Sequence, residues 1–150
     1  KKDDINFSYR YSTFPKDEIL IEADFKGFTR KSEDIKHEKL SASKKRRASQ
    51  PLKFRSAGSI FKNPSDLMAA GYLIDKVNLK GEYFGEAQIS EKHANWIVNK
   101  GGAKATDVMK LIKLAKTKVK SQFNIELQLE IKLLGFEDNV IKEFTGNRHV

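Results

Sequence analysis

The stretch SAGSIFKNP, residues 56–64, contains the serine that is best placed to do chemistry. Ser59 follows Gly58 in a segment that we expect to be a loop, and loops often expose reactive groups on a rigid scaffold. A nucleophilic serine needs a base such as histidine beside it, and the Gly-x-Ser-x-Gly turn of many hydrolases is absent. Lys62 and Asn63 precede an expected helix start, where free backbone N–H groups would help them to hold an anion. Composition alone therefore favours a turn serine and leaves a weak anion site open.

Three other polar residues could take part in binding or catalysis, and each also has a structural explanation. Arg10, beside Tyr9, carries a planar guanidinium fork that fits a carboxylate or a phosphate. His93 lies in a polar segment before an expected strand, where a histidine is more often structural than catalytic. Glu130 lies on the polar face of an expected strand, and periodicity does not distinguish it from Glu126. None of these residues indicates an activity by itself.

The composition excludes several classes of protein. The 150 residues include no cysteine and three histidines, so a disulfide framework is impossible and we expect no metal site. No apolar run reaches the roughly 18 residues that span a membrane, which predicts a soluble, cytoplasmic protein without a membrane partner. Because the chain starts at Lys1, we expect it to be a fragment of a longer protein.

The formal net charge of +9 raises the question of nucleic-acid binding. Basic residues are spread along the whole chain, and one dense cluster, KKRR, occupies residues 44–47. A solvated helix end explains this cluster best, because cations stabilise a helix C-terminus. An anion-binding patch is the second explanation. Nucleic-acid binding comes last, because no aromatic residues interleave with the cluster to stack on bases.

Hydropathy patterns predict a mixed α and β chain with two structural units. Residues 18–25, EILIEADF, predict a buried strand, and a polar helix follows from Ser32 to about Arg47, with Pro51 after its end. We place the boundary between the units near residue 50. In the second unit we expect helices from Pro64 and from Thr106, short strands at residues 84–89 and 95–98, and a long strand at residues 125–135.

Seven stretches, taken in order, resemble one protein family. They are YRYSTF, EILIEADF, RRASQPL, SAGSIFKNP, AGYLIDKVNLKG, AQISEKHANWIVNKGGAKATDV and IELQLEIKLLG. Together they resemble the C-terminal half of the UDP-N-acetylenolpyruvoylglucosamine reductases, the MurB family, from Phe7 to Gly135. The resemblance implies an α+β fold in two parts. Residues 1–50 would be the end of a FAD-binding, PCMH-like α+β domain with a connector helix, and residues 51–150 the MurB C-terminal substrate-binding α+β domain.

The resemblance also implies a flavoprotein oxidoreductase of peptidoglycan synthesis, and hence of cell-wall biogenesis, cell shape and cell division. Enzymes of this family reduce UDP-N-acetylglucosamine enolpyruvate to UDP-N-acetylmuramate. NADPH reduces FAD, and the flavin then delivers hydride to the enolpyruvyl methylene. The family's N-terminal region, which holds most of the FAD contacts, has no counterpart in this sequence. We therefore expect the isolated chain to be inactive. The resemblance also implies that the enzyme is a monomer.

By the same resemblance, Ser59 would donate a proton, and Arg10 and Glu130 would hold and polarise the substrate carboxylate. Residues that would contact other parts of the substrate or the nicotinamide are Tyr9, Arg46, Lys62, Asn63, Lys80 and His93. The alternative is a non-catalytic module that binds UDP-sugars or other polyanions. Titration with UDP-N-acetylglucosamine against a DNA duplex would separate a sugar-nucleotide site from a nucleic-acid site, because duplex binding weakens steeply with salt.

Overall fold

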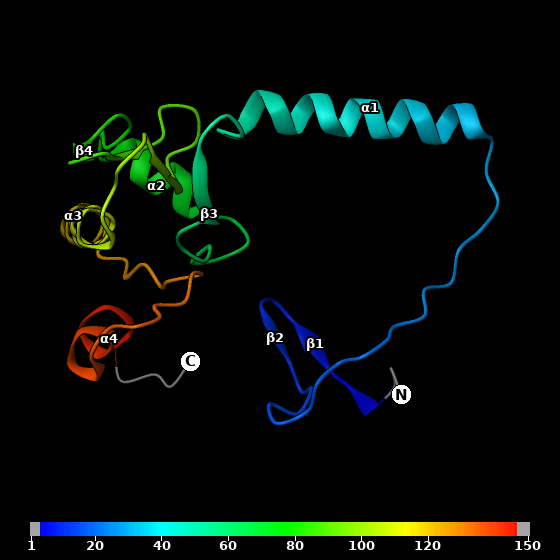
Figure 1. Cartoon of the computed structure of the whole chain (residues 1–150), viewed down its shortest axis with the longest axis horizontal. Helices are drawn as coiled ribbons and strands as arrows, with labels where there is room; N and C mark the ends of the chain where they lie inside the picture. The colour runs from blue at the N-terminus through cyan, green and yellow to red at the C-terminus, as the bar shows by residue number, and fades with distance from the viewer. Residues whose placement is uncertain (1–3, 147–150) are drawn as a thin grey trace. The chain divides into compact units, whose positions relative to one another are not determined.

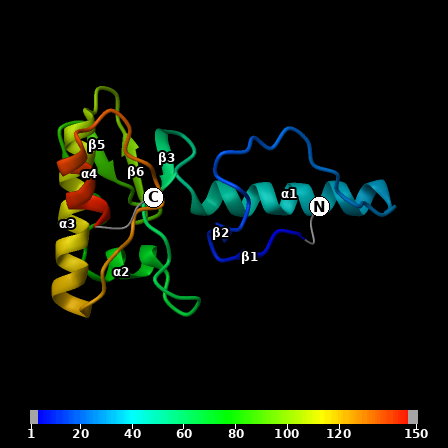
Figure 2. The same cartoon turned by 90° about the horizontal axis from the view of Figure 1, so that it is seen from below.

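The computed structural model describes residues 4–146, which belong to two units, Lys1–His37 and Glu38–Val150 (Figure 1). The first unit contains a small hairpin and an extended segment. The second contains a four-stranded antiparallel sheet with helices packed against it (Figure 2). This combination of helices with an antiparallel sheet confirms the predicted α+β class.

The hairpin of the first unit presents two of the predicted site residues in its turn. Its strands β1 (Phe7–Ser8) and β2 (Tyr11–Ser12) pair in antiparallel fashion. The two residues between them, Tyr9 and Arg10, are exposed, and Arg10 has a left-handed backbone with φ of 56°. A positive φ is typical of a two-residue hairpin turn, so the turn fixes the backbone positions of both residues.

Residues 18–25 do not form the predicted buried strand. The segment has no regular secondary structure, and its apolar side chains are exposed, with Ile21 at 93% and Phe25 at 91% of their full exposure. Alternating apolar residues indicate a strand only where a second backbone pairs with it. No other segment within residues 4–146 pairs with this one, and the prediction is therefore wrong for the described structure.

Helix α1 (Ser32–Ser49) confirms the predicted polar helix. It has no buried residue, and its charges complement the helix dipole, with Glu33 and Asp34 in the first turn and Arg46 and Arg47 in the last. The helix thus relies on its own charges and hydrogen bonds rather than on a packed face. The basic cluster at residues 44–47 lies near the C-terminal end of this helix, which continues to Ser49.

The sheet of the second unit has the strand order β3-β6-β5-β4, and every neighbouring pair is antiparallel. Its strands are β3 (Arg55–Ser59), β4 (Tyr83–Phe84), β5 (Ala87–Ile89) and β6 (Trp96–Asn99). The strand predicted at residues 95–98 is confirmed to within one residue. The single strand predicted at residues 84–89 is instead the β4–β5 hairpin, because Gly85 turns the chain with φ of 52°.

Helix α3 (Ala105–Phe123) supplies much of the core. It contacts β4, β5 and the short helix α2 (Ala70–Lys76). Next to it lies α4 (Asp138–Thr145), fixed by a hydrogen bond of 2.6 Å from Lys116 Nζ to the Phe144 carbonyl (Figure 2). Four of the five residues whose spacing predicts the buried face of α3 are buried, while Val108 is half-buried and Met109 is buried in addition. The buried residues are Met109, Leu111, Ile112, Ala115 and Val119.

Both helix starts predicted for the second unit shift in the structure. The helix predicted from Pro64 begins at Ala70, because a turn closed by the 3.2 Å hydrogen bond from Met68 N to Ser65 O comes first. The helix predicted from Thr106 begins one residue earlier, and Lys104 is its N-cap. The Lys104 N–H donates to Oδ2 of Asp107 at 3.0 Å, so Asp107 stabilises the first turn.

Residues 125–135 do not form the predicted long strand. Their side chains alternate as predicted, with Leu127 buried between the exposed Glu126 and Gln128. The backbone, however, makes one isolated bridge, from Leu129 to Phe61. The apolar alternation places one face of the segment on the core, but a β-strand also needs a neighbouring backbone that pairs with it along its length.

Gly85→Ala is expected to lower the free energy of unfolding by about 2 to 3 kcal/mol. A Cβ on Gly85 would lie 2.6 Å from Oδ2 of Asp107, the oxygen that caps α3, and the φ of 52° disfavours any L side chain. Urea unfolding followed by circular dichroism measures this loss.

Gly101→Ala is the matched control, because a Cβ there meets no atom within 4 Å. Its unfolding free energy should stay within about 0.5 kcal/mol of the wild type. Equal losses in the two variants would contradict the role given to Gly85.

Candidate functional site

Ser59 is the last residue of β3, rather than part of the predicted loop. The ladder between β3 and β6 pairs Ser56 with Val98 and then shifts register, so that Ser59 pairs with Trp96. Gly58 lies in this irregularity with φ of 85°, a conformation that glycine adopts without strain. The bulge ends the regular strand at Ser59, whose side chain is half-buried. A short backbone irregularity thus precedes the candidate proton donor.

Glu130 lies beside this strand end, because its backbone pairs with the residues that follow Ser59. The Glu130 N–H donates to the carbonyl of Ile60 at 2.8 Å, and the Lys62 N–H donates to the carbonyl of Gln128 at 2.9 Å. Glu130 is half-buried, and its Oε2 is shielded from solvent. The structure therefore joins the backbone of Glu130 to Ile60, the residue that follows Ser59, although the two segments are far apart in the sequence.

Asn95 holds the other side of the same segment. Its Oδ1 accepts a hydrogen bond from the Phe61 N–H at 2.9 Å, and its Nδ2 donates to the Phe61 carbonyl at 2.8 Å. Its own carbonyl accepts from the Ile60 N–H at 2.9 Å. The residue is 4% exposed. Sequence reasoning missed Asn95, and the available signal was a polar residue placed directly before an apolar strand.

The two residues predicted to hold an anion have different surroundings. Lys62 is half-buried on the segment beside Gln128. Asn63 is exposed, and its Oδ1 accepts a hydrogen bond of 3.1 Å from the N–H of Ala70 at the start of α2. Asn63 therefore has a structural task in addition to any contact with a ligand.

His93 connects Asn95 to the surface. Its Nδ1 accepts a hydrogen bond from the Asn95 N–H at 3.3 Å, and its ring centroid lies 6.2 Å from that of Trp96. Burial lowers the pKa of His93 below its ordinary value, the positive charge of Lys80 lowers it further, and a backbone hydrogen bond opposes both effects. Lys80 itself forms an ion pair of 2.7 Å with Asp75. A neutral imidazole is thus the favoured form of His93 in this position.

The remaining predicted residues lie elsewhere in the chain. Tyr9 and Arg10 belong to the first unit, and the Arg10 guanidinium lies 5.5 Å from the centre of the Tyr9 ring. Arg46 is exposed near the end of α1, where its Nε donates to Gln50 Oε1 at 3.0 Å. The convergence of Arg10 with Ser59 therefore stays a prediction.

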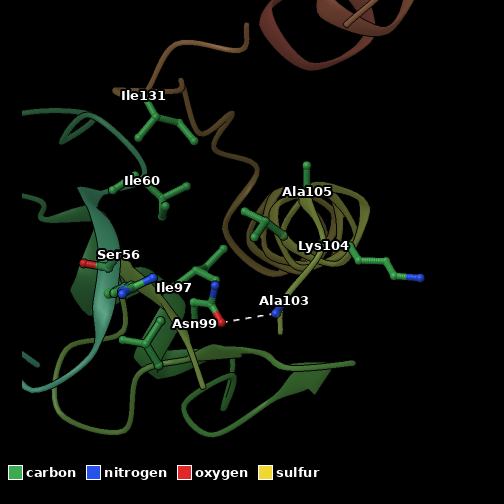
Figure 3. Close-up of a pocket in the computed structure, with 12 residues that line it drawn as sticks. Ser56, Ile60, Ile97, Asn99, Ala103, Lys104, Ala105 and Ile131 are labelled. Atoms are coloured by element: carbon green, nitrogen blue, oxygen red, sulfur yellow. Dashed lines mark hydrogen bonds between the residues drawn. The ribbon is translucent and has the colours of Figure 1, made fainter. Parts of the chain in front are cut away.

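A cavity of about 390 Å³ lies in the second unit, between β3, β6 and the start of α3 (Figure 3). Its lining is mostly apolar and includes Ile60 from the segment after β3 and Ile131 from the segment after Glu130. Asn99 borders it, with its Oδ1 accepting a hydrogen bond of 3.1 Å from the Ala103 N–H. Ser59 does not belong to its lining. The cavity therefore adjoins the segment after Ser59 but does not contain the candidate proton donor.

Two further classes of feature are absent from residues 4–146. No three His, Cys, Asp or Glu side chains gather there in a way that could hold a metal ion. None of the helices in that range combines the length and the apolar character needed to cross a membrane.

Comparison with known proteins decides the family. The model of the family described as "UDP-N-acetylenolpyruvoylglucosamine reductase, C-terminal domain" matches residues 50–134. The chain belongs to the UDP-N-acetylenolpyruvoylglucosamine reductase family. The MurB family match covers β3, the segment of Ile60 and Phe61, and the segment that carries Glu130.

Individual members of the MurB family agree with this result. The reductase of Fervidobacterium nodosum is 46% identical over 134 residues, which are 88% of this chain and 43% of the relative. The reductase of Chloroherpeton thalassium is 44% identical over 149 residues, which are 95% of this chain and 48% of the relative. The chain therefore spans slightly less than half the length of these relatives.

A solved structure of the family supports the fold. The crystal structure of UDP-N-acetylenolpyruvylglucosamine reductase (MurB) from Thermus caldophilus matches with a TM-score of 0.72 and 36% identity. The match covers 87% of this chain and 46% of that one. The resemblance seen in the sequence motifs is confirmed.

The pKa of His93 gives a testable pH dependence. A histidine whose folded pKa is lowered stabilises the fold fully above its unfolded pKa of about 6.5 and loses that contribution as the pH falls toward the folded pKa. Wild-type stability should therefore fall from near pH 7.5 to near pH 5.5 more steeply than that of His93→Gln, measured by urea unfolding.

The matched variant is Lys80→Met. Because it removes a nearby positive charge, an NMR titration of the His93 ring should give a higher midpoint in this variant than in the wild type. A wild-type midpoint at or above the ordinary value of 6.5 would refute the assignment.

Proposed function

We infer that this chain is the C-terminal part of an enzyme that reduces UDP-N-acetylglucosamine enolpyruvate to UDP-N-acetylmuramate in peptidoglycan synthesis. The inference is supported by the family to which the chain belongs and by one observation in particular. The 2.8 Å hydrogen bond from the Glu130 N–H to the Ile60 carbonyl joins the segment of Glu130 to the residue that follows Ser59. On this proposal residues 1–50 end a FAD-binding domain, residues 51–150 bind the substrate, and the enzyme is a cytoplasmic monomer.

The reaction requires a proton donor near a developing carbanion. Hydride addition to the enolpyruvyl methylene carbon pushes the π electrons onto the carbon beside the carboxylate, which gives an enolate-like dianion. A proton must then reach that carbon. Ser59 is the proposed donor. A hydroxyl is a weak acid, but the carbanion is a strong base, so a positioned weak acid suffices without a histidine beside it.

The dianion also requires stabilisation of its charge. We assign this role to Arg10, whose guanidinium fork suits a carboxylate, together with Glu130. An ionised Glu130 would repel the substrate carboxylate, so it acts either protonated or neutralised by Arg10. The shielding of its Oε2 from solvent is in keeping with a site from which water is excluded.

Further polar residues of the chain are proposed to bind the charged remainder of the substrate or the nicotinamide of NADPH. His93 would act as a neutral hydrogen-bonding group, because burial lowers its pKa. Lys80 would share its charge between the ligand and Asp75, its partner at 2.7 Å. The other residues assigned to ligand contacts are Tyr9, Arg46, Lys62 and Asn63.

FAD and NADPH are the proposed cofactors, and the backbone at Gly58, directly before Ser59, leaves room for a ligand to approach. No atom lies within 4 Å of the position that a Cβ on Gly58 would occupy, so open space adjoins the strand end. When bound, the flavin would supply the hydride that NADPH provides. Gly58 would allow the close approach, and Ser59 would hold the proton at its Oγ. The 150-residue chain alone is expected to be inactive, and flavin absorbance with NADPH-dependent turnover by the purified chain would refute that expectation.

Ser59→Ala tests the proposed chemistry in a full-length enzyme that carries this C-terminal sequence. Loss of the proton donor should slow reduction of the enolpyruvyl substrate by about 10²-fold or more and leave the reduction of flavin by NADPH nearly unchanged. Stopped-flow absorbance of the flavin measures both half-reactions separately.

Ser65→Ala is the control, because Ser65 is an exposed serine of the neighbouring turn. Both of its half-reactions should match the wild type. If Ser59→Ala slowed the two half-reactions equally, Ser59 would lose the role of proton donor.

A further inference from the structure

We propose that Asn95 is a positioning residue that sets Ser59 and Glu130 in their relative places. This inference rests on the proposed function, in which these two residues act on one substrate. Asn95 does not act on the substrate itself. It acts through the backbone of Ile60 and Phe61, the residues that directly follow Ser59.

The carboxamide of Asn95 replaces a strand that has ended. The β3–β6 ladder stops at the pair of Ser59 and Trp96, and the chain before Trp96 turns away through the 3.0 Å hydrogen bond from Trp96 N to His93 O. Beyond that point the Asn95 side chain satisfies both the N–H and the carbonyl of Phe61. The ladder thus continues through a side chain.

The same backbone carries Glu130 on its opposite side. The Ile60 carbonyl accepts from the Glu130 N–H at 2.8 Å, while the Ile60 N–H donates to the Asn95 carbonyl at 2.9 Å. Ile60 and Phe61 therefore lie between Asn95 and the segment of Glu130. A shift of these two residues would move Ser59, which precedes them, relative to Glu130, which is bonded to them.

The position requires an amide. Asn95 both donates and accepts at Phe61, and its exposed fraction of 4% leaves little access for water to replace either bond. An aspartate would accept from the Phe61 N–H but would set a carboxylate oxygen against the Phe61 carbonyl. His93 also holds Asn95 in place, because its Nδ1 accepts a hydrogen bond from the Asn95 N–H. Only a neutral imidazole can accept this bond.

The first test uses amide hydrogen exchange by NMR on the 150-residue chain. In Asn95→Asp and Asn95→Ala, protection at the amides of Ile60, Phe61 and Glu130 should fall about tenfold more than at Leu111 and Ala115 in the core of α3. Relative to the wild type at the same pH, Asn95→Asp should regain part of its protection between about pH 8 and about pH 5, because burial raises the pKa of the introduced carboxyl group and the protonated form can donate to the Phe61 carbonyl.

Asn99→Asp is the matched control on the neighbouring strand. Its Oδ1 accepts from the N–H groups of Gly101 and Ala103, and a carboxylate can accept both bonds. Protection near Ser59 should not change in this variant. A uniform fall across the domain in Asn95→Ala and Asn95→Asp, or no fall at all, would overturn the inference.

The second test uses the half-reactions of a full-length enzyme that carries this sequence. Asn95→Asp should slow substrate reduction by about tenfold near pH 8 and leave KM and flavin reduction within about twofold. Measured against the wild type at the same pH, the deficit should shrink at lower pH, where the introduced carboxyl group is protonated. A variant that raised KM with the rate unchanged would contradict the positioning role. If the wild-type enzyme failed to reduce the substrate, the proposed function would fall, while the exchange measurement would still decide what Asn95 does.

Discussion

The backbone of Ile60, Phe61 and Lys62 is the constraint on which the candidate site depends. On one side Asn95 bonds to Ile60 and Phe61, and on the other side Gln128 and Glu130 bond to Lys62 and Ile60. These three residues thereby connect the sheet to the extended segment at residues 125–135. Because buried backbone groups are costly to leave unpaired, the two sides support each other, and Ser59 takes its position from both.

The helices were predictable where their own residues determine them. The acidic first turn and basic last turn of α1 agree with its dipole, and the apolar spacing of α3 predicts the face that it buries. The strands at residues 18–25 and 125–135 were not predictable in the same way. Alternation indicates which side chains share a face, and it correctly marks Leu127 as buried. It does not indicate whether a partner backbone is present, and a strand requires one.

The site shows the same limit in another form. Composition could not distinguish Ser59 from any turn serine, or Glu130 from Glu126, and the family resemblance supplied both assignments. The structure adds a backbone pairing without a sequence signature, which joins Glu130 to Ile60, the residue that follows Ser59. Asn95 escaped notice because its task is to satisfy the backbone of Phe61, a contact between residues 34 positions apart. The role of Arg10, in the first unit, stays a prediction.

The pairing of residues 60–62 with residues 128–130 can be measured directly by NMR on the 150-residue chain. Phe61 and Leu129 form a bridge whose flanking hydrogen bonds run from Lys62 N to Gln128 O and from Glu130 N to Ile60 O. In such a non-hydrogen-bonded antiparallel pair the Cα atoms lie about 4.5 Å apart. A strong NOE between the Hα atoms of Phe61 and Leu129 is therefore predicted. Absence of that NOE in a folded chain would separate Glu130 from Ser59 and contradict the site described for them.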